Sequence, residues 1–568
     1  MNRTLRSVAG VLAVASVLIA SCSDDDKGSV GTDAGQILDL SAKPVESGLP
    51  NDAKPTRGGQ LVYALEATNL DFCLPSAQLA IAGIEMARSI YDPIVVPNGK
   101  GGYSPYLAES IEPNADYTVW TMKIRKGIKF HNGEVLNAEV MKNNIDAYRG
   151  KYPNRAALLL SFVFEDIEDV AVVDPYTLEF TMTKSWVAFP ASLYASGRVS
   201  VMAQEQLDDD EAGCKTNLIG TGPFHLTSFD TNSGILKVQR NEDYWVDAPD
   251  GKPYPYVNAI EFVPMPNDDA RIAALQNGDI NVMHSSSSTD IAGSLSQLRN
   301  DGAINLVVSQ ERTETAYFML NSENEPLDRL DARVAMAQAL DRDKINKEAN
   351  SGFATIANGP FAPGMPGHLD ETGLPAYDPE AAKAAVAKLK EAGLNTTLTL
   401  LTTTAPTTTR LAVLAKEMWE EAGFTVELEV ELQLDMIGRA IAGEYDVMFF
   451  RNQPGEDPDV NRIWWYGGGI TNFGNFNDPE INKALDVART STDEAARKEA
   501  YELVNRRMGS QVYNIYLYFQ PWAIAMADSV HDAFGPKLPN GDEPSLRLAT
   551  GHSLLGMWIE PGSVSTSG

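Results

Sequence analysis

Residues 117–141 read YTVWTMKIRKGIKFHNGEVLNAEVM, and no other stretch of the chain is as easy to place. Residues 118–125 alternate between an apolar-rich and a polar-rich set, which is the period of a half-buried strand. Gly127 and the pair Asn132-Gly133 mark two turns, because such residues accept a positive φ. A helix is predicted from Asn137. The stretch therefore predicts a strand, two turns and a helix in succession.

The length and charge of the chain set the outer limits. The chain has 568 residues, more than a single core normally serves, so we expect two or three domains. Its formal net charge of -31 argues against a nucleic-acid partner and fits a soluble, self-repelling protein. An acidic surface that attracts cationic ligands is the alternative explanation of this charge.

The first residues have the layout of an export signal. Arg3 and Arg6 precede an apolar run over residues 8–20, which is too short for a comfortable membrane span. The run leads into Ala20-Ser21-Cys22, which resembles the lipobox of bacterial lipoproteins. The resemblance implies that a signal peptide, residues 1–21, is removed and that Cys22 becomes the lipidated N-terminus. An ordinary cleaved signal is the alternative.

Two further features concern the segments after the signal. Residues 22–56 are rich in Asp, Gly, Ser and Pro, so a disordered tether is predicted there. The remaining cysteines are Cys73 and Cys214, and an even pair in an exported protein suggests a disulfide. Two separately buried thiols are the alternative.

The second half of the chain alternates helices with strands. Asp378-Pro379 is a plausible helix start, with Gly393 at the matching end, and residues 331–346 have helical spacing. Residues 426–432 alternate apolar residues with Glu, and residues 446–450 form another apolar run. This order predicts an α/β domain whose sheet contains parallel neighbours.

A search for catalytic motifs finds little. The sequence has no HExxH, GxSxG, CxxC, EF-hand or P-loop pattern, and its six His residues are scattered singly. The glycines around Thr221 fit a tight turn better than a phosphate loop, because Pro223 removes an amide donor. His131 and Glu134 suggest an acid–base pair, but their place in a turn favours a structural role. No catalytic residue, metal ligand or cofactor is predicted.

The best candidate binding segment is residues 449–476, FFRNQPGEDPDVNRIWWYGGGITNFGNF, which follows a predicted sheet strand. It offers a guanidinium for a carboxylate, carboxylates for an amine, and rigid aromatic walls. A zwitterionic peptide would need such groups. The alternative is that the aromatics belong to the core and the acids to a solvated loop. The predicted ligand-binding residues are Arg451, Glu456, Asp457, Trp464, Trp465, Tyr466, Asn472 and Phe473.

Four blocks of sequence, in order, resemble the family 5 extracellular solute-binding proteins, the dipeptide- and oligopeptide-binding components of ABC importers. The first block is Arg-Lys-Gly followed by Lys-Phe-His-x-Gly within residues 125–133. The others lie at residues 218–245, 331–342 and 445–459. In peptide-binding members an Asp after the Tyr-Asp strand pairs with the ligand amine. The matching position here is Glu456, or Asp457 with a shift of one residue.

The resemblance implies an α/β fold with two lobes, the large type II-like class of periplasmic binding proteins, with an extra domain inserted in the first lobe. The expected first lobe comprises residues 57–98, 215–312 and 519–568. The accessory domain is expected at residues 99–214 and the second lobe at 313–518. The chain is expected to cross between the lobes near residues 317–321 and 514–519.

Three functions follow as hypotheses. The first is a monomeric importer receptor that binds peptides or another medium-sized solute and meets ABC permease subunits. It would lie on the outer face of the cytoplasmic membrane, attached only through its lipid anchor. The second is a secreted hydrolase, although no nucleophile and base were found. The third is a surface sensor or adhesin with the same fold.

Overall fold

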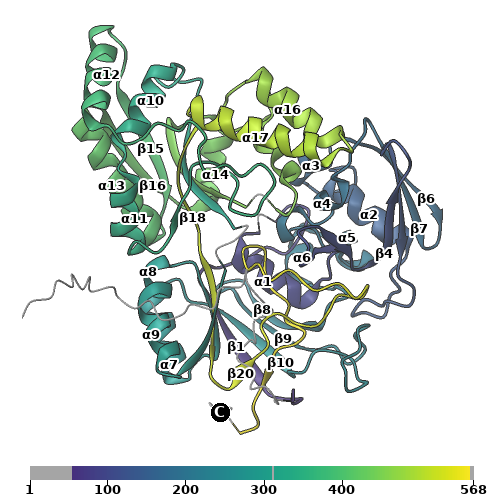
Figure 1. The fold of residues 1–568 in the computed structure, drawn as a ribbon. Coiled ribbons are helices and arrows are strands. Elements are labelled where there is room, and N and C mark those ends of the chain that lie inside the picture. The colour runs from purple at the N-terminus through teal and green to yellow at the C-terminus, as the bar shows by residue number, and fades with distance from the viewer. Residues whose placement is uncertain (1–53, 78, 310–312, 454, 563–568) are drawn as a thin grey trace, which may run out of the picture. The chain divides into compact units, whose positions relative to one another are not determined.

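The structure is a computed structural model that describes residues 54–77, 79–309, 313–453 and 455–562. The predicted signal peptide, Cys22 and residues 22–53 of the predicted tether lie outside the described residues. Two large sheets organise the described chain (Figure 1), and each draws its strands from separate parts of the sequence.

The first large sheet has seven strands in the order β12-β19-β11-β1-β10-β9-β8. β1 is parallel to both β10 and β11, while the remaining neighbours are antiparallel. The strands are β1 (Gln60–Leu65), β8 (Phe224–Asp230), β9 (Ile235–Arg240), β10 (Ala259–Pro264), β11 (Val282–Ser285), β12 (Ile304–Ser309) and β19 (Trp522–Ala527).

The second large sheet has six strands in the order β14-β18-β13-β17-β15-β16. The predicted parallel neighbours are present, since β15 is parallel to both β16 and β17. The strands are β13 (Thr315–Leu320), β14 (Thr355–Ile356), β15 (Thr397–Thr403), β16 (Thr425–Glu431), β17 (Val447–Asn452) and β18 (Asn514–Phe519).

An antiparallel four-stranded sheet, in the order β4-β5-β7-β6, holds the stretch that predicted the fold. Two strand pairs, β2-β3 and β20-β21, complete the sheets of the described residues. These strands are β2 (Val95–Pro97), β3 (Tyr103–Pro105), β4 (Ala108–Pro113), β5 (Val119–Ile124), β6 (Ile167–Asp174), β7 (Thr177–Met182), β20 (Val530–His531) and β21 (Trp558–Ile559).

Helices cover the sheets, and Figure 1 shows α10 to α13 beside β15 and β16. The helices in the first part of the chain are α1 (Ile81–Ile90), α2 (Ala138–Tyr148), α3 (Leu160–Val163), α4 (Phe189–Ser192), η1 (Ala195–Gly197), α5 (Gln204–Asp208), α6 (Glu211–Thr216), α7 (Asp268–Asn277), α8 (Ser288–Asp290), η2 (Ile291–Leu295) and α9 (Ser296–Asn300). Those in the second part are α10 (Leu330–Ala339), α11 (Arg342–Asn350), α12 (Pro379–Glu391), α13 (Pro406–Ala422), α14 (Gln433–Ala442), η3 (Pro458–Asn461), α15 (Arg462–Trp465), α16 (Pro479–Thr490) and α17 (Glu494–Ser510).

The stretch at residues 117–141 forms the elements it predicted. Trp120 and Met122 of β5 are buried, and the Asn137 side chain caps α2 by accepting from Val140 N at 3.0 Å. His131 Nε2 lies 3.0 Å from the carbonyl oxygen of Gly222, and burial lowers the pKa of His131 to about 4. This histidine is therefore neutral and fixes a turn.

The glycine at position 220 is required by a close backbone contact. A Cβ there would lie 2.0 Å from the carbonyl oxygen of Ile90, which is an impossible distance. The segment around Thr221 is therefore a tight structural turn against the end of α1, as its sequence favours.

The helical spacing over residues 331–346 belongs to two helices. α10 ends at Ala339 and α11 begins at Arg342, because the Asp341 side chain accepts from Lys344 N at 2.9 Å and caps a new helix. The start predicted at Asp378 is confirmed, since its side chain accepts from Ala381 N at 3.0 Å.

The two large sheets are joined where β12 leads to β13 and where β18 leads to β19. β13 and β18 lie wholly in the six-stranded sheet, so the described parts of the passages, residues 313–314 and 520–521, lie outside those strands. Gln520 N donates to Glu314 O at 2.8 Å, and Thr313 Oγ1 donates to Gln520 O at 2.6 Å. The two passages are therefore bonded to each other.

A disulfide joins Cys73 and Cys214, which are 141 residues apart in sequence. Both cysteines are buried, and the bond connects the segment before α1 to α6. The chain enclosed between them includes the whole four-stranded sheet.

Candidate functional site

A cavity of about 350 Å³ lies between segments of the two large sheets. Glu66, Asp268 and Ser286 line it, and they follow the carboxyl ends of β1, β10 and β11, the three parallel strands of the first sheet. Thr403 and Arg451 line it from the ends of β15 and β17, which are parallel in the second sheet. In open α/β sheets, ligands bind at such carboxyl ends. Both sheets therefore direct their ligand-binding edges at one cavity.

Glu66 is a fixed carboxylate on the first-sheet side. It accepts from Ser286 N at 3.0 Å and from Ser286 Oγ at 3.0 and 3.1 Å. Burial alone would raise the pKa of Glu66, but His284, Arg451, Arg271 and the Ser286 amide together lower it. This side chain is therefore ionised and already hydrogen-bonded.

The passages between the sheets contribute the carboxylate of Glu314, which has fewer hydrogen bonds than that of Glu66. Glu314 lines the cavity, and its Oε2 is buried without a hydrogen-bond partner in the described chain, 3.8 Å from Arg451 Nε. Burial raises the pKa of Glu314, while Arg451 and Arg198 act in the opposite direction. The buried indole of Trp522, in the same cavity wall, faces Glu314 and also acts to lower its pKa, although Nε1 has no partner within normal hydrogen-bond distance among the described residues.

Two of the predicted binding residues, Arg451 and Trp464, line this cavity. Arg451 Nη1 makes only long contacts, 3.3 Å to Gln520 Oε1 and 3.4 Å to Ser286 Oγ. The Trp464 ring is partly buried and lies 6.0 Å from the ring of Phe450. A guanidinium and an aromatic wall are thus available to a ligand.

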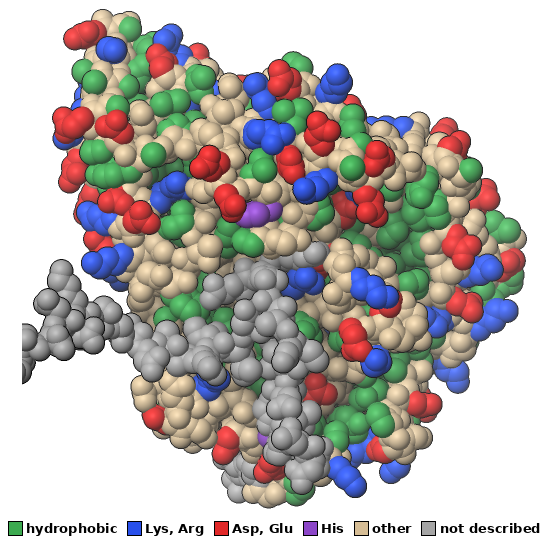
Figure 2. Space-filling view, viewed as in Figure 1, with side chains coloured by type: hydrophobic (Ala, Val, Ile, Leu, Met, Phe, Trp, Pro, Cys, Tyr) green, Lys and Arg blue, Asp and Glu red, His purple; other side chains and the backbone are tan. Residues whose placement is uncertain are grey.

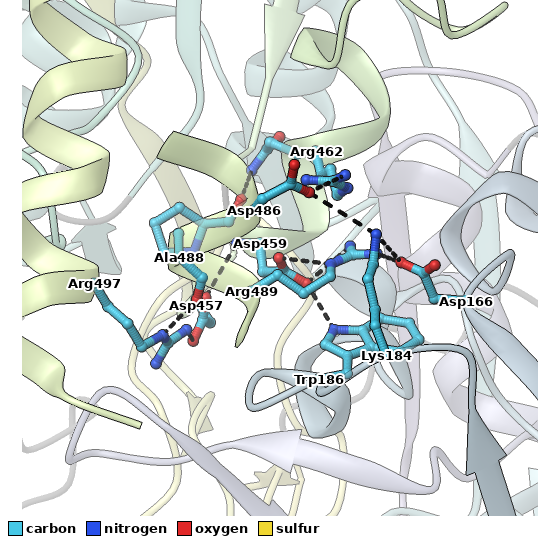
Figure 3. A network of polar contacts seen from close by, with 12 residues as sticks. Asp166, Lys184, Trp186, Asp457, Asp459, Arg462, Asp486, Ala488, Arg489 and Arg497 are labelled. Carbon is cyan, nitrogen blue, oxygen red and sulfur yellow. Dashed lines mark hydrogen bonds and ion pairs between the residues drawn. The ribbon is translucent and has the colours of Figure 1, made fainter. Parts of the chain in front are cut away.

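Glu456 and Asp457 do not line the cavity, because other side chains already bind their carboxylates. Arg547 Nη1 lies 3.3 Å from Glu456 Oε1. Asp457 pairs with Arg497 and accepts from the Tyr501 hydroxyl at 3.0 Å (Figure 3). Neither carboxylate is available for a ligand amine in this structure.

The four other predicted residues also lie outside the cavity lining. Trp465 is buried against Phe361, with ring centroids 5.5 Å apart, and Phe473 is buried beside Trp464. The Tyr466 hydroxyl donates to Asp486 at 3.3 Å, and Asn472 Nδ2 donates to Phe476 O at 2.8 Å. These side chains stabilise the segment at residues 449–476 rather than line the cavity.

The same segment takes part in a buried ionic cluster, which we call the Arg489 cluster: Asp166, Trp186, Asp459 and Arg489 (Figure 3). Arg489 binds both carboxylate oxygens of Asp459, at 3.0 and 2.9 Å, and Asp166 Oδ2 at 2.5 Å. Trp186 Nε1 donates to Asp459 at 2.8 Å. The cluster joins α16 and η3 to the turn before β6 and the loop after β7.

Most lining residues of the cavity escaped the sequence analysis, among them Arg198, Glu314 and Trp522. No motif contains them, and they come from three separate parts of the chain. The useful signal was the predicted pair of crossings between lobes, because Glu314 and Trp522 lie beside the observed passages. No motif or pattern in the sequence around Arg198 indicated that it lines the cavity.

The described residues contain no group of three His, Cys, Asp or Glu side chains placed to hold a metal ion. Within the same ranges, no helix combines the length and apolar character needed to cross a membrane. On the face in Figure 2, acidic and basic side chains are interspersed. The coloured part of that face presents no continuous basic surface for a nucleic acid.

Known proteins similar to this chain bind small solutes. Heme-binding protein A of Haemophilus influenzae is 26% identical over 563 residues, covering 93% of this chain and 94% of that protein. The dipeptide-binding protein of Escherichia coli K12 is 28% identical over 385 residues, covering 62% of this chain and 68% of that protein.

A solved structure confirms the predicted two-lobed fold. The oligopeptide-binding protein AppA of Bacillus subtilis, in complex with a nonapeptide, matches with a TM-score of 0.74. Its sequence is 20% identical, and the match covers 89% of this chain and all of AppA, 100%. Residues 102–473 match the sequence profile of the bacterial extracellular solute-binding proteins, family 5. Because this match spans more than half of the sequence, the chain belongs to the family 5 extracellular solute-binding proteins.

Proposed function

We propose that this chain captures a peptide or a similar medium-sized solute and delivers it to the permease subunits of an ABC importer. The observation that carries the proposal is the cavity at the carboxyl ends of the parallel strands of both large sheets. Its volume of about 350 Å³ lies within the usual range for small-molecule sites, roughly 300–1,000 Å³.

The cavity chemistry favours a ligand with charged ends and apolar side chains. Glu66, Asp268 and Glu314 supply carboxylates, while Arg198 and Arg451 supply guanidinium groups. Apolar lining comes from both parts of the chain, including Ile81, Leu159, Val163, Met436, Phe450 and Trp464. A short peptide carries both charges and apolar groups, and two of the relatives named above bind peptides.

Capture is proposed to occur by hinge closure about the described passages at residues 313–314 and 520–521. These passages connect the two large sheets and form hydrogen bonds with each other, so a rotation at this place would move one sheet relative to the other.

The place of action is proposed to be the outer face of the cytoplasmic membrane, with the chain held as a monomer by lipid on Cys22. The support is the Ala20-Ser21-Cys22 sequence after an apolar run. Labelling the full chain with an alkyne-bearing fatty acid in cells should mark the wild type and leave Cys22→Ser unmarked. Equal labelling of both would contradict the anchor.

Ligand binding is tested by melting the purified protein with di- to tetrapeptides of Ala and Leu, and separately with haemin. A ligand that binds the folded state raises the melting temperature, by an amount that grows with its concentration above Kd. We expect stabilisation by peptides and recovery of the peptide unchanged by mass spectrometry. Stabilisation by haemin alone would reject the peptide proposal, and cleaved peptide would favour the hydrolase hypothesis.

A further inference from the structure

A short segment from the region around the four-stranded sheet reaches the cavity. The α3 segment, which we define as residues 157–163, lies between α2 and β6 and belongs to neither large sheet. Its residues Leu159, Leu160 and Val163 line the cavity. The neighbouring Leu158 does not line it, and its side chain is 51% exposed. The cavity wall therefore includes a part of the region that the four-stranded sheet organises.

The backbone of the α3 segment is held by contacts within this region. Leu158 has a positive φ of 37°, which is uncommon for a residue other than glycine, so this turn depends on its surroundings. Ser161 Oγ donates to the carbonyl oxygen of Leu158 at 2.8 Å. Just before the segment, the buried Arg155 donates from Nε to the carbonyl oxygen of Leu207 at 2.9 Å. The segment is therefore a fixed part of the wall.

The α3 segment also contacts the part of the chain that carries the second large sheet. Leu159 packs against a buried apolar cluster that includes Met436, and Trp464 packs against the same cluster. Beyond the C-terminal end of α3, Asp166 Oδ2 accepts from Arg489 Nη1 of α16 at 2.5 Å (Figure 3). An apolar contact and an ion pair thus hold the segment next to the residues that line the cavity from the second sheet.

The side chains that the α3 segment adds to the cavity are all apolar. Further apolar lining comes from Met436 and Ile437 of α14 and from Ile463 and Trp464 of α15. The carboxylates of the cavity come instead from segments after β1 and β10 and from a passage between the sheets. Leucine and valine side chains form no hydrogen bonds, so this wall is stabilised when an apolar group of a solute displaces water from it.

We infer that the α3 segment selects the captured solute by an apolar group, namely an aliphatic side chain of a short peptide that packs on Leu159 and Val163. This inference rests on the proposed capture of a peptide in the same cavity. It gives the region around the four-stranded sheet a part in choosing the ligand, whereas the sequence analysis placed all of its candidate binding residues within residues 449–476.

The test measures the preference for leucine over alanine by calorimetric titration. The probes are all-Ala peptides of two to four residues, and the same peptides with one Leu at each position in turn. We expect wild type to bind at least one Leu peptide about tenfold or more tightly than the all-Ala peptide of equal length, because three more carbon atoms are buried. Leu159→Ser should lower this preference by at least about threefold, and Leu159→Met should keep it.

The matched control is Leu158→Ser, one residue away, because this side chain is outside the cavity lining. It should keep the wild-type preference. A purely structural role of Leu159 would weaken the binding of both peptides equally and leave the preference unchanged, so an unchanged preference in folded Leu159→Ser would overturn the inference.

The wild-type comparison needs no variant to fold. If peptides bind but none is preferred for its Leu, the inference is overturned and peptide capture stands. If none of the peptides binds, the proposed function fails and the inference fails with it.

Discussion

Two clusters in this protein use arginine and carboxylate side chains in opposite ways. In the Arg489 cluster, all three guanidinium nitrogens of Arg489 bind carboxylates, and the indole of Trp186 completes the coordination of Asp459. In the cavity, Arg198 has one hydrogen bond and Glu314 Oε2 has none in the described chain. One cluster is internally satisfied, and the other has free bonding capacity.

The difference separates a structural role from a binding role more clearly than residue type does. Asp457, Asp459 and Arg451 all belong to one segment of sequence, yet only Arg451 lines the cavity. A satisfied cluster holds the fold in one arrangement, and removing a member leaves a buried charge unpaired. We propose that a ligand completes the unsatisfied cluster. The predictions below test this division.

The largest effect is expected from Arg489→Ala. Asp459 and Asp166 would remain as buried carboxylates without their cation, so the free energy of unfolding should fall by about 3–5 kcal/mol. Urea unfolding followed by tryptophan fluorescence measures the change. Arg506→Ala, at an exposed site, should change it by less than about 0.5 kcal/mol. Similar losses in both variants would show that the Arg489 cluster adds no stability.

The next prediction compares Arg451 with Asp457, two residues of the same segment. Replacing the first should affect binding, and replacing the second should affect stability. Arg451→Met should weaken binding of the tightest peptide by at least about tenfold, or about 1.4 kcal/mol, while stability changes little. Asp457→Asn should keep the affinity and lose stability, because Arg497 and Tyr501 hold that carboxylate. Calorimetry and urea unfolding of both variants measure the two quantities. The opposite pattern would mean that the cavity is not the binding site.

A smaller effect concerns the pH dependence of Asp166→Asn. Burial alone would raise the pKa of Asp166, but Arg489, Lys184 and Thr183 lower it below its ordinary value. Its stabilising contribution is then present above the ordinary Asp pKa of about 3.9 and is lost as pH falls through the depressed folded-state pKa.

At pH 7 the variant should be less stable than wild type by about 1–2 kcal/mol, and the difference should shrink below pH about 4. Urea unfolding at stepped pH values measures it. Asp169→Asn, at an exposed position of β6, serves as the control and should differ from wild type by less than about 0.5 kcal/mol. A difference that stays constant down to pH about 3 would contradict the ion pair.

The smallest expected effect is a gain in the free energy of unfolding, whereas the stability effects above are losses. Burial raises the pKa of Glu314 more than Arg451 and Arg198 lower it, so the folded state disfavours its ionised form. Glu314→Gln should therefore stabilise the unliganded protein at pH 7, by up to about 1 kcal/mol. As pH falls through the raised pKa, wild type becomes protonated and the gain should disappear. A loss of stability at pH 7 would place Glu314 among the satisfied groups.

Local structure was predictable where the determining contacts are close in sequence. The cap at Asp378 and the alternation in β5 each depend on residues within one or two turns or strands, and the structure confirms them. The helical spacing over residues 331–346 did not reveal the break between α10 and α11, because the cap at Asp341 lies inside an apolar pattern that continues through it.

The binding site was harder to predict because its partners are distant in sequence. Asp459 could not be separated from Arg451 without knowing that Arg489, 30 residues away, and Trp186, 273 residues away, would bind it. Arg198 could not be found because its free nitrogens are a property of the packed fold. The resemblance to family 5 supplied the fold, but it did not indicate which charged groups remain unsatisfied.

The disulfide between Cys73 and Cys214 has a mechanical consequence. It closes a covalent loop between two cysteines 141 residues apart in sequence, so a force applied at the two ends of the chain passes through the sulfur bridge and bypasses that loop. The bypassed segment has a stretched length of roughly 470–500 Å. A chain extended between its two ends should gain that length only after reduction. The region around the four-stranded sheet is thus isolated from tension along the chain.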